Sequence, residues 1–81
     1  MYYVYLLRSE KDPSKTYVGY TTNIEERLER HNKGDCTRHT DEHMPWKLVV
    51  FLAFDSEKKA RSFERYIKEG SGYAFAKRRF W

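Results

Sequence analysis

Two polar side chains fall on the apolar side of a helix that the sequence predicts between residues 22 and 32. At roughly 100° per residue, Arg27 and His31 share the side that carries Ile24 and Leu28, whereas the other charged residues point to solvent. A guanidinium can bind a phosphate at such a position, and an imidazole beside it can hydrogen-bond or relay a proton. These two residues therefore mark a candidate site.

A carboxylate occupies a comparable position on a second predicted helix. Glu64 lies at the edge of an apolar face formed by Ala60 and Ile67. A lone buried carboxylate is unfavourable unless it is paired or binds a metal ion. Two interpretations remain open: Glu64 pairs with Arg27 inside the fold while His31 is a satisfied core histidine, or Glu64 is a metal ligand.

Two predicted strands of an N-terminal hairpin carry a pair of phenols, Tyr5 and Tyr17. Gly19 follows Tyr17 by two residues, and a glycine in a strand permits close approach, so we expect room for a phosphate beside a phenol. Phosphodiester hydrolysis needs a base that activates water, a cation for the developing phosphoryl charge, and a metal ion at an oxygen of the phosphate. Packing within the sheet is the alternative role for both tyrosines.

The periodicity of the sequence predicts the elements that must position these groups. We expect strands over residues 2–8, 16–20 and 47–54, and helices over 22–32, 56–69 and 73–81, with Gly-Ser-Gly at 70–72 breaking the second helix. Thr22 and Glu25 have the spacing of a capping box, Gly34 is expected to end the first helix, and residues 34–46 are expected to form a polar loop. This order predicts one α+β domain over residues 1–81: a small three-stranded antiparallel sheet flanked by helices, β-β-α-β-α-α.

Composition bounds the class of protein. The chain has 81 residues and a formal net charge of +4, which is compatible with a polyanionic partner without establishing one. Cys36 is the only cysteine, so no intrachain disulfide can form, which favours a reducing compartment. The apolar run at the start is too short for a signal peptide or a membrane span. We therefore expect a soluble cytoplasmic protein with no membrane partner.

Taken in order, these residues resemble the GIY-YIG nuclease family, in particular its small stand-alone members. The resemblance covers essentially the whole chain and rests on Tyr3-Val4-Tyr5 at the first motif, Tyr17-Val18-Gly19 at the second, Arg27, His31 and Glu64. It implies a metal-dependent endonuclease that hydrolyses phosphodiester bonds. It further implies a structure-specific or repair-related enzyme, with DNA favoured over RNA as the substrate.

The resemblance also implies a role for each of the five catalytic candidates. Tyr17 corresponds to the general base or water activator, and Tyr5 to a residue that orients the water or Tyr17. Arg27 corresponds to the residue that holds the scissile phosphate, and His31 to a hydrogen-bond partner or proton relay near it. Glu64 corresponds to the ligand of one Mg²⁺ or Mn²⁺. A phenol has a reference pKa of about 10, so we expect positive charge on Arg27 and His31 to lower it.

The sequence departs from the family pattern in three respects. Tyr3 stands where the name-giving motif has Gly, at a position that we expect to be structural. Many relatives carry an Asn in the last segment, and this chain has no Asn after Asn32. Larger members carry a separate DNA-binding domain, so we expect a protein partner to supply specificity here. A non-catalytic nucleic-acid-binding module that retains the fold is the alternative function.

Basic side chains outside the catalytic set are candidates for contacts with a nucleic-acid backbone. They are Arg38 and His39 in the predicted loop, and Lys77, Arg78 and Arg79 near the end of the chain. The last three lie next to the aromatic residues Phe80 and Trp81, a combination of basic and aromatic side chains that proteins use to bind single strands. The alternative is a final helix that closes the core with Phe80 and Trp81.

A zinc site is a weaker hypothesis. Cys36, His39 and His43 lie close together in the sequence. Their spacing fits no standard zinc finger and no fourth ligand is evident, so the sequence favours a polar loop over a zinc site.

Overall fold

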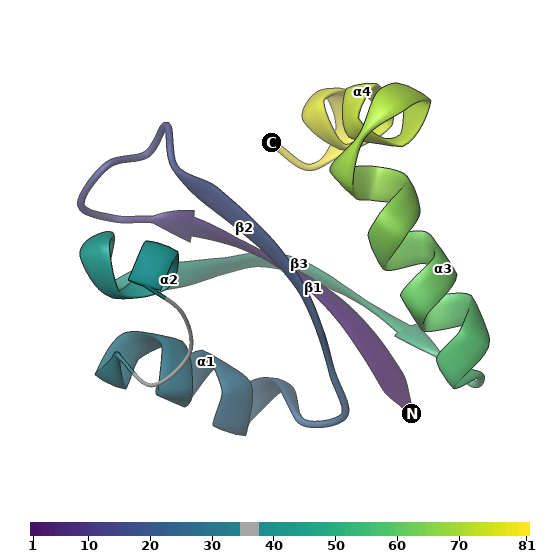
Figure 1. Ribbon diagram of the computed structural model, residues 1–81, viewed down its shortest axis with the longest axis horizontal. Helices are drawn as coiled ribbons and strands as arrows, with labels where there is room; N and C mark the ends of the chain where they lie inside the picture. Colours follow the sequence, from purple (N-terminus) through teal and green to yellow (C-terminus); the bar gives the residue numbers. More distant parts are fainter. Residues whose placement is uncertain (35–37) are drawn as a thin grey trace.

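The computed structural model describes residues 1–34 and 38–81 (Figure 1). Within them, one antiparallel sheet is formed by β1 (Tyr2–Ser9), β2 (Thr16–Thr21) and β3 (Trp46–Phe54), in the order β2-β1-β3. The helices are α1 (Ile24–Lys33), α2 (Arg38–Glu42), α3 (Glu57–Lys68) and α4 (Gly70–Arg79). No helix in these residues is long and apolar enough to cross a membrane. The predicted α+β fold is confirmed, with one additional helix.

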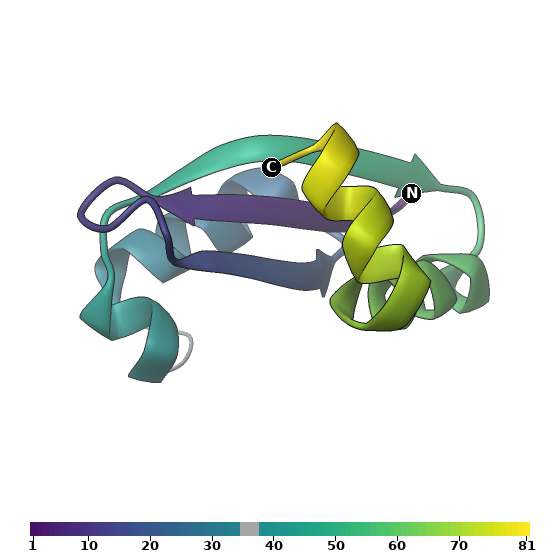
Figure 2. The same ribbon diagram turned by 90° about the horizontal axis from the view of Figure 1, so that it is seen from above.

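The central strand β1 divides the core between the two faces of the sheet. Val4 and Leu6 are fully buried in a cluster with residues of α3 and α4, whereas Tyr5 and Leu7 are buried in a second cluster with residues of α1 and β3. Successive side chains of a strand point to opposite faces, which explains this division. Figures 1 and 2 show α1 and α2 on one side of the sheet and α3 and α4 on the other.

The predicted start of α1 is wrong by one residue. Asn23 is the N-cap, and its side-chain oxygen accepts a hydrogen bond from the backbone N–H of Glu26 at 3.1 Å. The Thr21 hydroxyl accepts the backbone N–H of Asn23 at 3.1 Å, so it fixes the residue that precedes the helix. Gly34 ends the helix in the left-handed conformation, with φ of 80°, as the sequence predicted.

The loop expected over residues 34–46 contains the short helix α2. The Trp46 indole N–H donates to the backbone oxygen of Thr40 at 2.8 Å, and Thr40 is fully buried. Asn32 joins the same region to α1, because its side chain accepts from the Trp46 N–H at 2.6 Å and donates to the Trp46 carbonyl at 3.2 Å. A helix of five residues is too short to show a period in the sequence, and these non-local contacts stabilise it.

The expected break at residues 70–72 is also misplaced. Those residues form the first turn of α4, and the break falls at Glu69, which is extended with φ of −153° and ψ of 166°. A Cβ on Gly72 would lie 1.8 Å from the carbonyl oxygen of Tyr66. The glycine therefore permits α4 to pack against the end of α3, and does not interrupt a helix.

We predict that Asn23→Ala lowers the free energy of unfolding by about 1 kcal/mol, because the first turn of α1 loses its side-chain cap. Thr22→Ala is the matched control, since Thr22 is exposed and lies one residue outside the cap. Urea unfolding followed by circular dichroism measures both variants. An equal or larger loss in Thr22→Ala would contradict the assignment of the cap.

Candidate active site

Three ring side chains meet on the α1 face of the sheet. The Tyr5 phenol oxygen lies 2.8 Å from Nε2 of His31, and both side chains are buried. The ring centroid of Tyr17 is 4.8 Å from that of His31 and 6.2 Å from that of Tyr5. The strand register produces this arrangement, because β1 and β2 pair antiparallel with Tyr5 opposite Gly19. The hairpin thus brings both phenols to one region, and α1 adds the imidazole.

A glycine is required at position 19 for a different reason from the one that the sequence suggested. A Cβ built on Gly19 would lie 2.4 Å from both Cζ and the phenol oxygen of Tyr5. The space over this glycine is therefore filled by Tyr5, and the expectation of room there for a phosphate is corrected. Any larger residue would displace the phenol that bonds His31.

His31 is neutral near pH 7, which corrects the expectation that it carries charge. Burial, together with the neighbouring cations Arg27 and Arg30, lowers the pKa of His31 to about 4. Its Nδ1 is buried and has no hydrogen-bond partner among the described residues. His31 therefore acts as a neutral partner that holds the Tyr5 phenol, which leaves Arg27 to supply positive charge.

Arg27 lies where α1 approaches the end of β2. Its Nη1 donates to the backbone carbonyl of Tyr20 at 3.4 Å. Its Nε is buried without a hydrogen-bond partner in the part of the chain that the structure describes. A buried, unpaired N–H of this kind is unfavourable, so it marks a position where a polar partner is expected. The sequence placed this guanidinium beside the core, and the structure places it against β2.

Glu64 lies on α3, across the sheet from α1. Its Oε2 accepts a hydrogen bond from Nζ of Lys68 at 3.0 Å, and its side chain is 19% exposed. Among the described residues, no ion pair joins Glu64 to Arg27, so the internal pair considered from the sequence is not formed. The carboxylate is instead held by a lysine one turn later on its own helix.

A groove of about 250 Å³ lies at the free edge of β2. Its lining residues come from β2, from the end of α3, and from α4 and the segment after it: Thr16, Tyr17, Val18, Ile67, Lys68, Tyr73 and Trp81. Tyr17 forms one wall and Lys68 another, and Lys68 holds Glu64. We call this groove, together with Tyr5, His31, Arg27 and Glu64, the β2-edge site.

Cations surround the β2-edge site from both faces of the sheet. Arg27 contacts Tyr20 from the α1 face, and the guanidinium of Arg61 lies 4.1 Å from the centroid of the Tyr20 ring. Lys68 follows Arg61 by two turns on α3. Neither Arg61 nor Lys68 was a candidate from the sequence, although spacings of three and four residues from Glu64 place all three on one side of the helix.

The remaining sequence candidates divide between the site and the periphery. His39 is exposed on α2, its ring stacks at 6.4 Å from Tyr17, and its Nε2 lies 3.4 Å from the carbonyl oxygen of Thr16. The side chain of Arg38 lies outside the described residues. The other three candidates are exposed in the last turn of α4, namely Lys77, Arg78 and Arg79. Phe80 and Trp81, which follow them, pack against the core of the α3 face.

The histidines of the zinc hypothesis do lie together, but its cysteine falls outside the described residues. The rings of His39 and His43 are 5.2 Å apart, and Cys36 belongs to the segment that is not described. In residues 1–34 and 38–81, no three His, Cys, Asp or Glu side chains gather into a metal site. The expectation that this segment is not a zinc finger is unchanged.

The residues of the β2-edge site fit a divalent ion of the magnesium type. Mg²⁺ usually keeps several waters and is held by one or two carboxylates together with substrate phosphates. Glu64 offers one carboxylate, only partly exposed, at the side of the groove. This donor set suits an ion whose coordination is completed by water and substrate, and it does not suit a closed protein cage.

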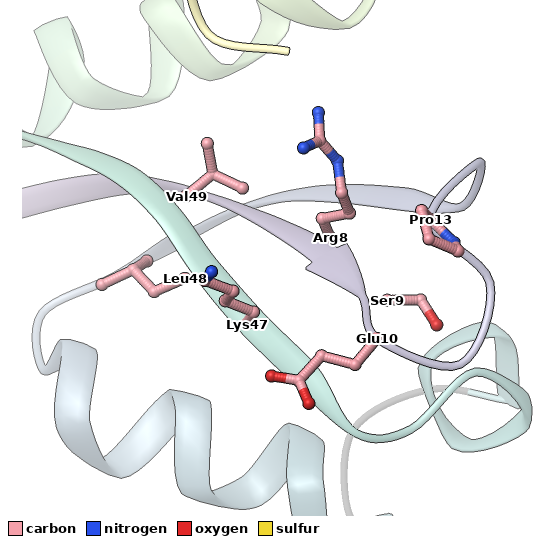
Figure 3. Close-up of a pocket in the computed structure, with 7 residues that line it drawn as sticks. All are labelled: Arg8, Ser9, Glu10, Pro13, Lys47, Leu48 and Val49. Atoms are coloured by element: carbon pink, nitrogen blue, oxygen red, sulfur yellow. The ribbon is translucent and has the colours of Figure 1, made fainter.

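A larger hollow elsewhere contains none of the catalytic candidates. It measures about 600 Å³, and Figure 3 shows its side chains at the end of β1, in the hairpin and at the start of β3. Arg8, its main cation, donates to the backbone oxygen of Trp81 at 2.7 Å and lies over the Trp81 ring. This guanidinium is therefore engaged in fixing the end of the chain.

Comparison with known proteins agrees with this geometry. A family model described as the GIY-YIG catalytic domain matches residues 1–77. The chain belongs to the GIY-YIG family. It is therefore a member of a family of nucleases, which generally use a divalent metal ion.

The similar proteins are small members of the same family. The UPF0213 protein CPE1444 of Clostridium perfringens is 44% identical over 69 residues, which cover 85% of this chain and 72% of that protein. The UPF0213 protein HQ_3675A of Haloquadratum walsbyi is 39% identical over 67 residues, which cover 83% and 73%. The solution NMR structure of the UPF0213 protein BH0048 from Bacillus halodurans superposes with a TM-score of 0.55 at 31% identity, over 95% of this chain and 81% of that one.

We predict that acid destabilises the protein through His31. The pKa of His31 is about 4 in the folded chain and about 6.5 when unfolded, so its contribution is complete above pH 6.5 and is lost as pH falls towards 4. His31→Gln should therefore destabilise strongly at pH 7.5 and much less at pH 5, because glutamine does not titrate. Urea unfolding at both pH values measures the difference.

His39→Gln is the control for this prediction, because His39 is exposed. Its free energy of unfolding should follow the same pH dependence as that of the unmodified protein. If His31→Gln also kept that dependence, the buried neutral imidazole would not be the titrating group.

Proposed function

We propose that this protein is a metal-dependent endonuclease that hydrolyses phosphodiester bonds in DNA. The main support is the buried hydrogen bond between Tyr5 and His31, which holds a phenol beside Tyr17. Arg27 contacts β2 from the α1 face, and Glu64 lies on α3, on the other face, paired with Lys68. Packing alone does not require an unpaired guanidinium nitrogen and a partly buried carboxylate on two sides of one exposed strand. Both features are suited to a bound phosphate and its counter-ion.

The proposed reaction assigns one task to each side chain. Tyr17 lines the groove and orients the attacking water. In its phenolate form it accepts a proton from this water as the water oxygen bonds to phosphorus and the bond from phosphorus to the leaving sugar oxygen breaks. Tyr5, fixed by the neutral His31, orients Tyr17 and the water. Arg27 binds the scissile phosphate and balances the charge that develops on its oxygens.

Glu64 completes the site from the α3 side. Its carboxylate would hold a divalent ion, Mg²⁺ or Mn²⁺, which would supply positive charge for the phosphate oxygens. Lys68, which donates a hydrogen bond to this carboxylate, lines the groove that Tyr17 also lines. In this proposal, Tyr17 and the pair of Glu64 and Lys68 border one path for a nucleic-acid strand along the edge of β2.

The substrate and cellular context form part of the same proposal. The formal net charge of +4 and the cations around the β2-edge site favour a polyanion. His39 lies against Tyr17 and is the best placed of the peripheral candidates to contact the backbone. We assign DNA over RNA from the family resemblance, together with a repair-related or structure-specific task in the cytoplasm and a protein partner that supplies specificity.

A non-catalytic nucleic-acid-binding module is the second candidate. The pairing of Glu64 with Lys68 favours it, because a carboxylate that is already satisfied by a lysine has less need of a metal ion. This module would keep the cations of the β2 edge and bind DNA without cleaving it. Cleavage assays separate the two candidates.

We predict that Glu64→Gln lowers the rate of plasmid nicking with Mg²⁺ or Mn²⁺ by about a hundredfold or more, because a neutral amide is a poor ligand for these ions. The melting temperature should change little, since ion pairs of this kind contribute at most about 1 kcal/mol. Binding to DNA, measured by fluorescence anisotropy, should be largely retained.

Glu57→Gln is the matched control, because Glu57 forms the same type of pair with Arg61 on the same helix. It should nick at the normal rate. Normal nicking by Glu64→Gln would contradict the metal-ligand role, and salt-sensitive binding without any nicking by the unmodified protein would favour the binding module.

A further inference from the structure

The pair formed by Glu64 and Lys68 differs from the other ion pairs of the helices. Five pairs within the described residues join side chains four apart, and in the other four the acid is 52–79% exposed. Glu64 is only 19% exposed, while Lys68 is 49% exposed. The carboxylate is therefore set into the protein surface, and the ammonium closes its open side.

Lys68 also faces the groove that contains the proposed water activator. Its side chain lines the groove together with Tyr17 and Trp81. Arg27 lies on the other face of the sheet, against the end of β2. A phosphate bound in this groove beside Tyr17 would thus lie near the Lys68 ammonium. A flexible lysine stem can move its charge between neighbouring partners, unlike the rigid fork of an arginine.

We propose that Lys68 is a phosphate-binding residue of the β2-edge site, and that its ammonium competes with a divalent ion for the Glu64 carboxylate. This inference rests on the proposed function. Binding of the ion at Glu64 displaces the ammonium, because one carboxylate edge cannot serve both cations at close range. The released ammonium then contacts a phosphate in the groove.

Two consequences distinguish this role from that of an ordinary surface pair. First, Lys68 competes with the divalent ion, so its removal tightens metal binding, and this effect requires Glu64. Second, Lys68 contributes a contact to DNA only when the ion has released it. A solvated pair would show neither effect, since exposed ion pairs contribute little.

The first experiment is a titration with Mn²⁺ followed by electron paramagnetic resonance, without nucleic acid. Lys68→Met keeps the aliphatic stem that lines the groove and removes the charge. We expect it to tighten Mn²⁺ binding by about two- to fivefold, the equivalent of the loss of one exposed ion pair. In a Glu64→Gln background the same substitution should have no effect, which completes a double-mutant cycle.

Lys59→Met is the matched control. Lys59 pairs with Asp55 four residues earlier, next to the same helix, and it lines a different hollow from Lys68. Its Mn²⁺ affinity should equal that of the unmodified protein. If Lys59→Met tightened Mn²⁺ binding as much as Lys68→Met, the effect would come from overall charge, and the proposed competition at Glu64 would be wrong.

The second experiment measures DNA binding against salt concentration, with Ca²⁺ or with EDTA. With Ca²⁺, Lys68→Met should lower the slope of log affinity against log salt by about 0.9, which corresponds to one phosphate contact on a duplex. With EDTA the change should be smaller, and Lys68→Arg should restore the contact. An unchanged slope in both conditions would overturn the phosphate-binding role.

The outcomes separate this inference from the proposed function. If nicking depends on Glu64 but Lys68→Met changes neither the metal affinity nor the salt slope, the nuclease function stands and Lys68 is not part of the site. Absence of nicking in every ion would remove the nuclease, whereas competition at Glu64 would still support the role of Lys68 in metal binding. Equal Mn²⁺ binding by the unmodified protein and Glu64→Gln would overturn both.

Discussion

The hydrogen bond between Tyr5 and His31 is the interaction on which the arrangement of the site depends. It joins the central strand to α1 across 26 residues of sequence, in a place from which solvent is excluded. A buried phenol and a buried imidazole each need a polar partner, so each fixes the position of the other. Once α1 is held in this way, Arg27 lies one turn earlier against β2. The same contact requires a glycine at position 19, because only a residue without a Cβ leaves room for the phenol.

The free edge of β2 is the second constraint. An unpaired strand edge can join other strands, and proteins usually protect such edges with charge or with covering elements. Here the cations Arg27, Arg61 and Lys68 gather beside this strand, and α3 and α4 form a groove with it. The same charges that discourage pairing with another strand attract a polyanion. Protection of the edge and binding of a phosphate backbone are therefore compatible in one surface.

The sequence predicted the elements well because their signals are local. The antiparallel hairpin and the end of α1 at Gly34 follow from patterns within a few residues. Helical periodicity likewise placed Arg27 and His31 beside the core. The short helix α2 was missed, because the contacts that stabilise it come from Trp46 and have no local pattern.

Properties that depend on packing were beyond the sequence. The charge state of His31 follows from its complete burial beside two arginines, which helical periodicity alone does not reveal. The role of Gly19 depends on where the Tyr5 ring lies over the neighbouring strand. The link from Glu64 to Tyr17 through Lys68 depends on how α3 crosses the sheet. Each of these features joins residues from different elements, so no pattern within a single sequence reveals it.

The central claim is that groups on opposite faces of the sheet form one metal-dependent site at the edge of β2. Titration with Mg²⁺, followed by NMR of the side-chain carboxyl carbons and the aromatic rings, tests it most directly. The account predicts that the Glu64 carboxyl signal and the Tyr17 ring signals shift together with one dissociation constant, while Phe51 at the opposite edge strand does not shift. A Glu64 signal that does not respond to Mg²⁺, or one that shifts while Tyr17 remains unaffected, would contradict the account.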